Sequence, residues 1–174
     1  MVQPLPIVLL HGVGLDHTMW EPLRAELARF TDCPVVALDL PGHGAQPHLT
    51  GPATLTELAE DVAARLPGPA HLVGFSLGAL IAQHLGRHRP ELVATLISVS
   101  SVCRRTPEEA ASVQRRLEGA RADFPGSVEA SIGRWYPADS GVDAGTDVRD
   151  VVPHLRASIT PMLTAGSDAS TYTP

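Results

Sequence analysis

The chain is poor in cysteine: only Cys33 and Cys103 occur among its 174 residues. They lie too far apart for a metal-binding pair and are too few for a disulfide framework, so reduced, partly buried thiols are expected. The sequence also lacks clusters of metal ligands with suitable spacing, and neither G-x-G-x-x-G nor G-x-x-x-x-G-K-S/T occurs. These absences predict a protein that uses no metal or nucleotide cofactor.

Long apolar runs and basic stretches are lacking as well. The first residues carry no positive charge, and the apolar run Ile7–Leu10 is too short for a signal peptide or a membrane span. With 13 Lys and Arg against 19 Asp and Glu, the formal net charge is −6, and no basic stripe with interleaved aromatic residues occurs. The sequence therefore predicts a soluble, cytoplasmic protein whose partners are neither nucleic acid nor membrane. It carries no readable signal for an oligomeric state.

The residues that are present suit an α/β fold with one compact core. Hydrophobic residues make up 44% and charged residues 18% of the chain, which is typical of a globular protein. Short apolar runs predict strands at 7–10, 35–38, 71–73 and 92–99, the last of them central in its sheet. Helical patterns lie between them, at about 21–30, at 55–66 after a Thr54 or Thr56 cap, and from Leu77 onward. This alternation predicts a mostly parallel sheet with helices on both faces.

The pattern changes in the second half of the chain. Residues 1–102 carry the strand and helix alternation, whereas 103–158 are rich in charged amphipathic helix and predict a short helical cap. Residues 159–174 return to the core sheet, because Pro161-Met162-Leu163-Thr164 has strand character. That strand leads to Asp168.

The pentapeptide Gly74-Phe75-Ser76-Leu77-Gly78 is the strongest chemical signal. It matches the G-x-S-x-G nucleophile elbow, in which a serine sits on a strained turn between a strand and a helix. A side chain at either glycine would crowd the turn that lifts the hydroxyl above the sheet. The N-terminal end of the following helix favours negative charge at the site. The alternative interpretation is an ordinary glycine-rich turn.

Two further turns precede this motif in order: His11-Gly12-Val13-Gly14 and Asp39-Leu40-Pro41-Gly42-His43-Gly44. Together with the pentapeptide and the later segment 159–168, they resemble the H-G, D-x-P-G-x-G, G-x-S-x-G and acid-strand motifs of the α/β-hydrolase fold family. Within it, the chain is similar to small bacterial 3-oxoadipate enol-lactonases, carboxylesterases and pimeloyl-ester esterases. The segment 104–136 is similar to the cap of the enol-lactonase group.

The resemblance implies a role for each matching position. Ser76 would be the nucleophile and Asp168 the acid that orients a histidine, with the competing alternative that Asp168 is a turn residue. The backbone N–H groups of Val13 and Leu77 would form the oxyanion hole, and Gly12 would shape it with the elbow glycines Gly74 and Gly78. A serine at the elbow implies acyl transfer on a small ester or lactone, without cofactor.

The pattern departs from the family at its end. The expected order is serine, acid, histidine, but all eight histidines precede Asp168. His154 is the weak candidate for a substitute base. The last strand and helix of the family fold are also missing, so we expect a C-terminally incomplete chain with low or no activity. The alternatives are a non-catalytic, hydrolase-like binding protein and a haloperoxidase-like side activity.

Overall fold

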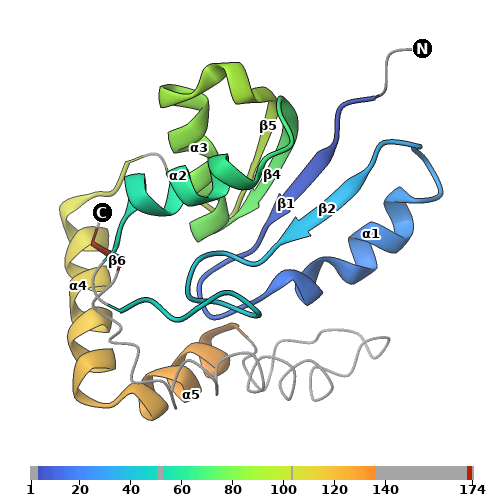
Figure 1. The fold of residues 1–174 in the computed structure, drawn as a ribbon. Helices are drawn as coiled ribbons and strands as arrows, with labels where there is room; N and C mark the ends of the chain where they lie inside the picture. The colour runs from blue at the N-terminus through green and yellow to red at the C-terminus, as the bar shows by residue number, and fades with distance from the viewer. Residues whose placement is uncertain (1–3, 51–52, 103, 136–171, 174) are drawn as a thin grey trace.

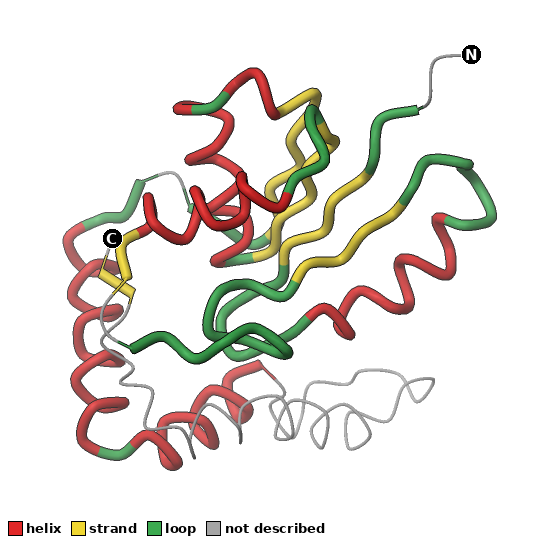
Figure 2. Tube along the Cα trace, in the orientation of Figure 1, coloured by secondary structure: helices red, strands yellow, loops and turns green. Residues whose placement is uncertain are grey.

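The computed structural model describes residues 4–50, 53–102, 104–135 and 172–173. Its centre is a four-stranded sheet in the order β2-β1-β4-β5, in which every pair is parallel. The strands run side by side in Figure 2. They are β1 (Ile7–Leu10), β2 (Val35–Leu38), β4 (Ala70–Phe75) and β5 (Val93–Val99). The parallel sheet predicted from the alternating pattern is confirmed.

Helices cover both faces of this sheet, as predicted (Figure 1). On one face lie α2 (Leu55–Arg65) and α3 (Leu77–His88), and on the other lies α1 (Glu21–Leu27), which a short helix, η1 (His17–Trp20), precedes. The core lies between the sheet and the α2–α3 pair. It contains apolar side chains from both strands and helices, among them Val8, Leu72, Val62, Ile81 and Leu85. Burial of these side chains is the main force that holds the helices on the sheet.

Thr54 is the residue that caps α2. Its hydroxyl oxygen accepts a hydrogen bond from the Glu57 N–H at 3.2 Å, and the Glu57 carboxylate accepts one from the Thr54 N–H at 2.7 Å. This reciprocal capping box satisfies two backbone donors at the end of the helix. The capping box explains why the helix starts at Leu55. Of the two predicted capping residues, Thr54 and Thr56, it identifies Thr54 as the cap.

The first helix is shorter than predicted. It ends at Leu27, and Phe30 is 79% exposed instead of lying on the buried face. The chain tightens after Leu27, because the N–H groups of Arg29 and Phe30 donate to carbonyls three residues back, at 2.9 Å each. Such bonds wind the backbone more tightly than an α-helix, which turns Phe30 away from the sheet.

The apolar run of β5 predicts a central strand. Within the described residues β5 pairs with β4 alone, and Ile97 is 56% exposed. The strand predicted at 161–164 lies outside the described residues, so the central position of β5 stays a prediction.

Two helices follow the sheet. They are α4 (Pro107–Ala122) and α5 (Phe124–Trp135), and they lie beyond the carboxyl ends of the strands (Figure 1). The described part of 103–158 is therefore mostly helical, and residues 136–158 lie outside the described residues. A short parallel pair, β3 (Ala53–Thr54) with β6 (Tyr172–Thr173), was not predicted. No helix in the described ranges is both long and apolar enough to cross a membrane.

Candidate active site

Ser76 occupies a strained turn between β4 and α3. Its backbone has φ 51° and ψ −108°, a conformation that residues other than glycine rarely adopt. The Ser76 N–H donates to the carbonyl of Val99 at 2.9 Å, and the Ser76 carbonyl accepts from Ala79 and Leu80 at 3.1 Å each. The strand, sharp turn and helix expected around the serine are therefore present. The side chain is half-buried rather than fully exposed.

The glycines on both sides of Ser76 are required by close approach of the backbone. A Cβ atom on Gly74 would lie 2.4 Å from the carbonyl oxygen of Gly78. A Cβ atom on Gly78 would lie 2.2 Å from the carbonyl oxygen of Leu10. The Gly78 N–H also donates to the His11 carbonyl at 3.0 Å. Any larger residue at either position would push α3 away from the ends of β4 and β1.

The turn after β1 packs directly against the elbow. A Cβ atom on Gly12 would lie 2.8 Å from the Phe75 ring and 3.3 Å from the Ser76 Cβ. Gly12 therefore brings the backbone of this turn close to Ser76. Among the described residues, neither the Val13 N–H nor the Leu77 N–H donates to a protein acceptor. Neither donor is therefore used by the described part of the protein.

His11 is a structural residue at this turn. It is fully buried, its Nε2 accepts from the Leu40 N–H at 2.9 Å, and its Nδ1 lies 2.7 Å from the Gly12 carbonyl. Nε2 must carry no proton in order to accept, so Nδ1 is the protonated donor. Burial lowers the pKa of His11 to about 4. The neutral ring thereby joins the turn after β1 to the turn after β2.

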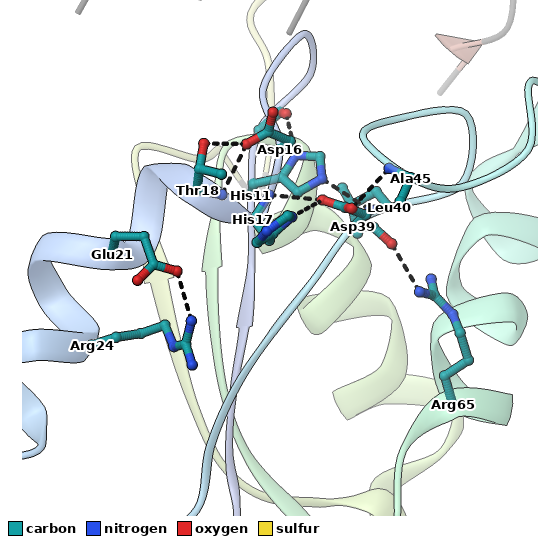
Figure 3. A network of polar contacts seen from close by, with 11 residues as sticks. His11, Asp16, His17, Thr18, Glu21, Arg24, Asp39, Leu40, Ala45 and Arg65 are labelled. Atoms are coloured by element: carbon teal, nitrogen blue, oxygen red, sulfur yellow. Dashed lines mark hydrogen bonds and ion pairs between the residues drawn. The ribbon is translucent and has the colours of Figure 1, made fainter. Parts of the chain in front are cut away.

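Asp39 organises the second turn (Figure 3). Its Oδ1 accepts from the His17 N–H and lies 2.8 Å from His17 Nδ1, while Oδ2 accepts from the Ala45 N–H at 2.9 Å. Burial raises the pKa of Asp39, but these hydrogen bonds outweigh it and hold the pKa below its ordinary value. The Asp39 carbonyl also accepts from Arg65 at 2.8 Å. The carboxylate is therefore committed to loop structure.

The last residue of the same turn, Gly44, must be glycine. Its φ is 54°, and a Cβ atom there would lie 2.3 Å from the Asp39 carboxyl carbon. His43 is buried against His11, with ring centroids 5.1 Å apart, and its Nδ1 lies 2.9 Å from the Pro41 carbonyl. Burial lowers the pKa of His43 as well. Both motif histidines thus hold the loops in which they lie.

A cavity of about 300 Å³ opens beside Ser76. One wall is formed by Ser76, Leu80 and the residues after β5. The other wall comes from the segment that leads into α4 and from α4 itself, through Arg105, Glu109 and Arg116. Those side chains were predicted only as parts of amphipathic helices. No single-sequence pattern shows that they face a serine far away in the chain.

The other predicted site residues are not all within the described ranges. Asp168 and the alternative base His154 lie outside them, so the expected proximity of Asp168 to Ser76 stays a prediction. The structure brings Gly12 close to Ser76 and packs Gly74 against Gly78 in the same turn, and Val13 directly follows Gly12 in the chain. Among the described residues, no group of three or more His, Cys, Asp or Glu side chains is placed to hold a metal ion.

Comparisons with known proteins agree with this geometry. A family model described as "Alpha/beta hydrolase family" matches residues 7–174. A pimeloyl-acyl-carrier-protein methyl ester esterase from Aeromonas hydrophila is 36% identical over 166 residues, which covers 91% of this chain and 64% of the relative. A solved thermophilic esterase from Thermogutta terrifontis, with malate bound, is 30% identical with a TM-score of 0.74, covering 97% and 61% of the two chains.

The fold extends to more distant structures. The solved enol-lactonase from Burkholderia xenovorans LB400 is 24% identical with a TM-score of 0.74, and the match covers 97% of this chain and 62% of that one. At this identity the similarity concerns the fold alone. The chain spans about half to two thirds of the length of the relatives that it matches.

Proposed function

Because the chain belongs to the alpha/beta hydrolase family, we propose that it carries a serine hydrolase site that cleaves small carboxylic esters or enol lactones. The observation that carries this proposal is the strained backbone of Ser76, with φ 51°, between β4 and α3. Strain of this kind persists only where the surrounding structure enforces it, and it is concentrated at functional sites. Relatives with esterase activity support the same reaction class.

The proposed reaction is acyl transfer in two steps. The Ser76 Oγ attacks the carbonyl carbon of the ester while a base takes the hydroxyl proton. The bond to the leaving alkoxide then breaks, and that oxygen receives the proton. Water attacks the acyl-serine in the same manner, which releases the carboxylic acid and restores the Ser76 hydroxyl. In a lactone, the leaving oxygen stays attached to the product.

Negative charge on the carbonyl oxygen would be stabilised by two backbone donors. The N–H groups of Val13 and Leu77 are uncommitted within the described residues. Leu77 is also the first residue of α3, a helix of 12 residues, so the positive end of the helix dipole lies at the site. Removing a single oxyanion donor typically costs about a hundred- to a thousandfold in rate.

The acid and the base complete the proposal. Asp168 is assigned as the acid, on the family motif alone. Two of the described histidines, His11 and His43, are buried and bound within loops, and no histidine follows Asp168 in the sequence. We therefore expect this chain to have low or no turnover unless a histidine is supplied. Residues 103–158 would form a cap over the site, with 1–102 as the core and 159–174 returning to it.

A rate assay tests the proposal. Initial rates on p-nitrophenyl butyrate would be compared for this chain and for the chain extended with the C-terminal segment of the Aeromonas hydrophila relative, of which the match covers 64%. The extended chain should exceed this chain by at least about a hundredfold, because general-base catalysis contributes about a hundred- to ten-thousandfold.

Two serine variants make the assay specific. Ser76→Ala in the extended chain should abolish turnover, whereas Ser112→Ala, which removes another hydroxyl from the same cavity, should leave most of it. Equal rates for both chain lengths, lost in Ser76→Ala, would show that a base already exists within this chain. His154→Ala would then identify it. Turnover that persists in Ser76→Ala would contradict the proposal.

The alternative is a binding protein that uses the cavity without chemistry. It predicts ligand binding at the cavity together with inactivity of the extended chain.

A further inference from the structure

Two histidines lie one turn apart near the end of α3, away from the cavity beside Ser76. His84 and His88 are four residues apart, so their side chains share one face of the helix. Their ring centroids are 4.3 Å apart, and the ring planes are inclined by 35°. His84 is half-buried and His88 is exposed, so the pair can be reached from solvent.

The ring nitrogens of this pair are not used by the protein. In the described part of the chain, neither His84 nor His88 forms a side-chain hydrogen bond or an ion pair with a protein group. By contrast, His71 Nδ1 lies 2.8 Å from the Thr95 hydroxyl oxygen, and both nitrogens of His11 are engaged. Burial, and then the charge of His88, lower the pKa of His84. At neutral pH His84 therefore has a neutral imidazole, which is the form that binds a metal ion.

The charges around the pair favour a cation on balance. Glu60 of α2 acts on His84 as a nearby negative charge, and its carboxylate lies 2.8 Å from Arg89, which keeps it engaged. His88 is the last residue of α3, so the negative end of the helix dipole lies beside the pair. Arg87 opposes a cation at His84, but its side chain is exposed and its charge is screened by water and salt.

We propose that His84 and His88 form a surface site for one divalent transition metal ion, Cu²⁺ or Ni²⁺, with water completing the coordination. Imidazole nitrogens suit these ions, whereas Mg²⁺ and Ca²⁺ prefer oxygen ligands. Two metal–nitrogen bonds of about 2.1 Å that meet at a right angle place the ring centroids about 4.5 Å apart, and a tetrahedral angle places them about 5.2 Å apart. The observed 4.3 Å is closer to the right angle, which is the geometry typical of Cu²⁺ and Ni²⁺ rather than Zn²⁺.

This site is independent of the proposed hydrolase chemistry. His84 follows Ser76 by eight positions along α3, which corresponds to about 12 Å of helix. A metal ion bound there does not touch the reacting atoms at Ser76. It would instead join the last two turns of α3, and because it binds the folded helix it would stabilise the folded chain.

Calorimetric titration of the untagged chain with Ni²⁺ alone tests the site directly. The buffer must not chelate metals, and the pH should be near neutral, so that the imidazoles are not protonated. One Ni²⁺ per chain should bind at the tightest site, more tightly than Zn²⁺, and Mg²⁺ should not compete with it. Tighter binding of Zn²⁺ than of Ni²⁺, or displacement of Ni²⁺ by Mg²⁺, would contradict the proposed ligands and geometry.

Variants locate the binding. His84→Ala and His88→Ala should each weaken Ni²⁺ binding by at least about tenfold, because loss of even an outer-shell partner costs about 10- to 100-fold in metal affinity. His48→Ala is the matched control, since His48 is exposed in a loop outside α3, and it should leave the affinity unchanged. Unchanged affinity in the two α3 variants, or an equal loss in His48→Ala, would overturn the inference.

Thermal unfolding gives a second readout that separates binding from folding. At a Ni²⁺ concentration about a hundredfold above the dissociation constant, Tm of the parent chain should rise by about 5 °C, and the rise should vanish in both α3 variants. Because His88 is exposed, His88→Ala should keep the parent Tm when no metal is added. A rise in Tm with Ni²⁺ that persists in His88→Ala would assign the metal to other residues and refute the site.

Discussion

Replacing Gly78 by alanine tests how closely α3 must approach the sheet at the elbow. The added Cβ would lie 2.2 Å from the Leu10 carbonyl oxygen and 2.7 Å from that of His11. Both contacts are with backbone atoms, so neither can be relieved by a change of rotamer. Because Leu10 is in β1 and the Gly78 N–H donates to His11 at 3.0 Å, the start of α3 must move as a unit.

The size of the effect follows from two opposing terms. Overpacking a well-packed site costs about 1–3 kcal/mol, and backbone contacts belong at the upper end of this range. Alanine in place of glycine in a helix returns about 1 kcal/mol. The net loss of unfolding free energy is therefore about 2 kcal/mol, which lowers Tm by about 4–8 °C for a chain of this size.

Gly86→Ala is the matched control on the same helix. Its Cβ would meet only the Leu96 Cδ1 at 3.6 Å, an ordinary van der Waals contact. This variant should gain about 0.5–1 kcal/mol. Thermal unfolding followed by circular dichroism compares both variants with the parent. If Gly78→Ala were as stable as Gly86→Ala, the close packing of α3 against β1 would be wrong, and with it the position of the Leu77 N–H.

Three further predictions concern the two turns beside the site and the cap of α2. Burial lowers the pKa of His11 to about 4. Between about pH 6.5 and pH 4, His11 is therefore protonated in the unfolded chain but neutral in the folded chain. The free energy of unfolding should fall as the pH drops from about 6.5 to about 4, and His11 should contribute a slope that approaches about 1.4 kcal/mol per pH unit. The variant His11→Gln should reduce this slope. Asp39→Asn should cost about 2 kcal/mol near neutral pH, because the amide NH2 must face one of the two N–H groups, that of His17 or that of Ala45, which each donate to a carboxylate oxygen. Thr54→Ala should cost about 1 kcal/mol through loss of the α2 cap.

Denaturant titrations at several pH values would measure the free energy of unfolding of each variant and of the parent chain. The pKa of Asp39 is lowered on folding, so its contribution is complete above about pH 4, the ordinary value, and is lost as pH falls through the folded pKa. The Asp39→Asn penalty should accordingly shrink in acid, and a penalty independent of pH would contradict the role of the charge. Thr56→Ala is the control for Thr54. If His11→Gln kept the full pH dependence of the unfolding free energy, that dependence would arise from other groups, of which His43 would be tested first.

The sequence predicts the elements near the site well because two kinds of signal agree there. Strands β1 and β2 have the predicted bounds, since each is a short apolar run closed by a turn with glycine. The elbow at Ser76 was predicted from its glycines, which the structure explains by backbone contacts of 2.2 and 2.4 Å. Local pattern and packing require the same residues at these positions.

Features that depend on distant contacts were not predictable in this way. The sequence did not show that Phe30 points away from the sheet or that Asp39 binds His17. Arg105 and Arg116 looked like ordinary helix-surface charges. Their place beside Ser76 depends on how α4 lies against the sheet, and hydrophobic periodicity carries no information on that arrangement.

The most direct test of the central claim is mass spectrometry of the acyl-enzyme. The extended chain would be mixed with p-nitrophenyl butyrate, quenched in acid during the first turnovers and digested for peptide mapping. Acyl transfer through Ser76 predicts a burst of p-nitrophenol and a butyryl group on Ser76, both absent in Ser76→Ala. Hydrolysis without a covalent adduct, or an adduct on another residue that persists in Ser76→Ala, would contradict the account.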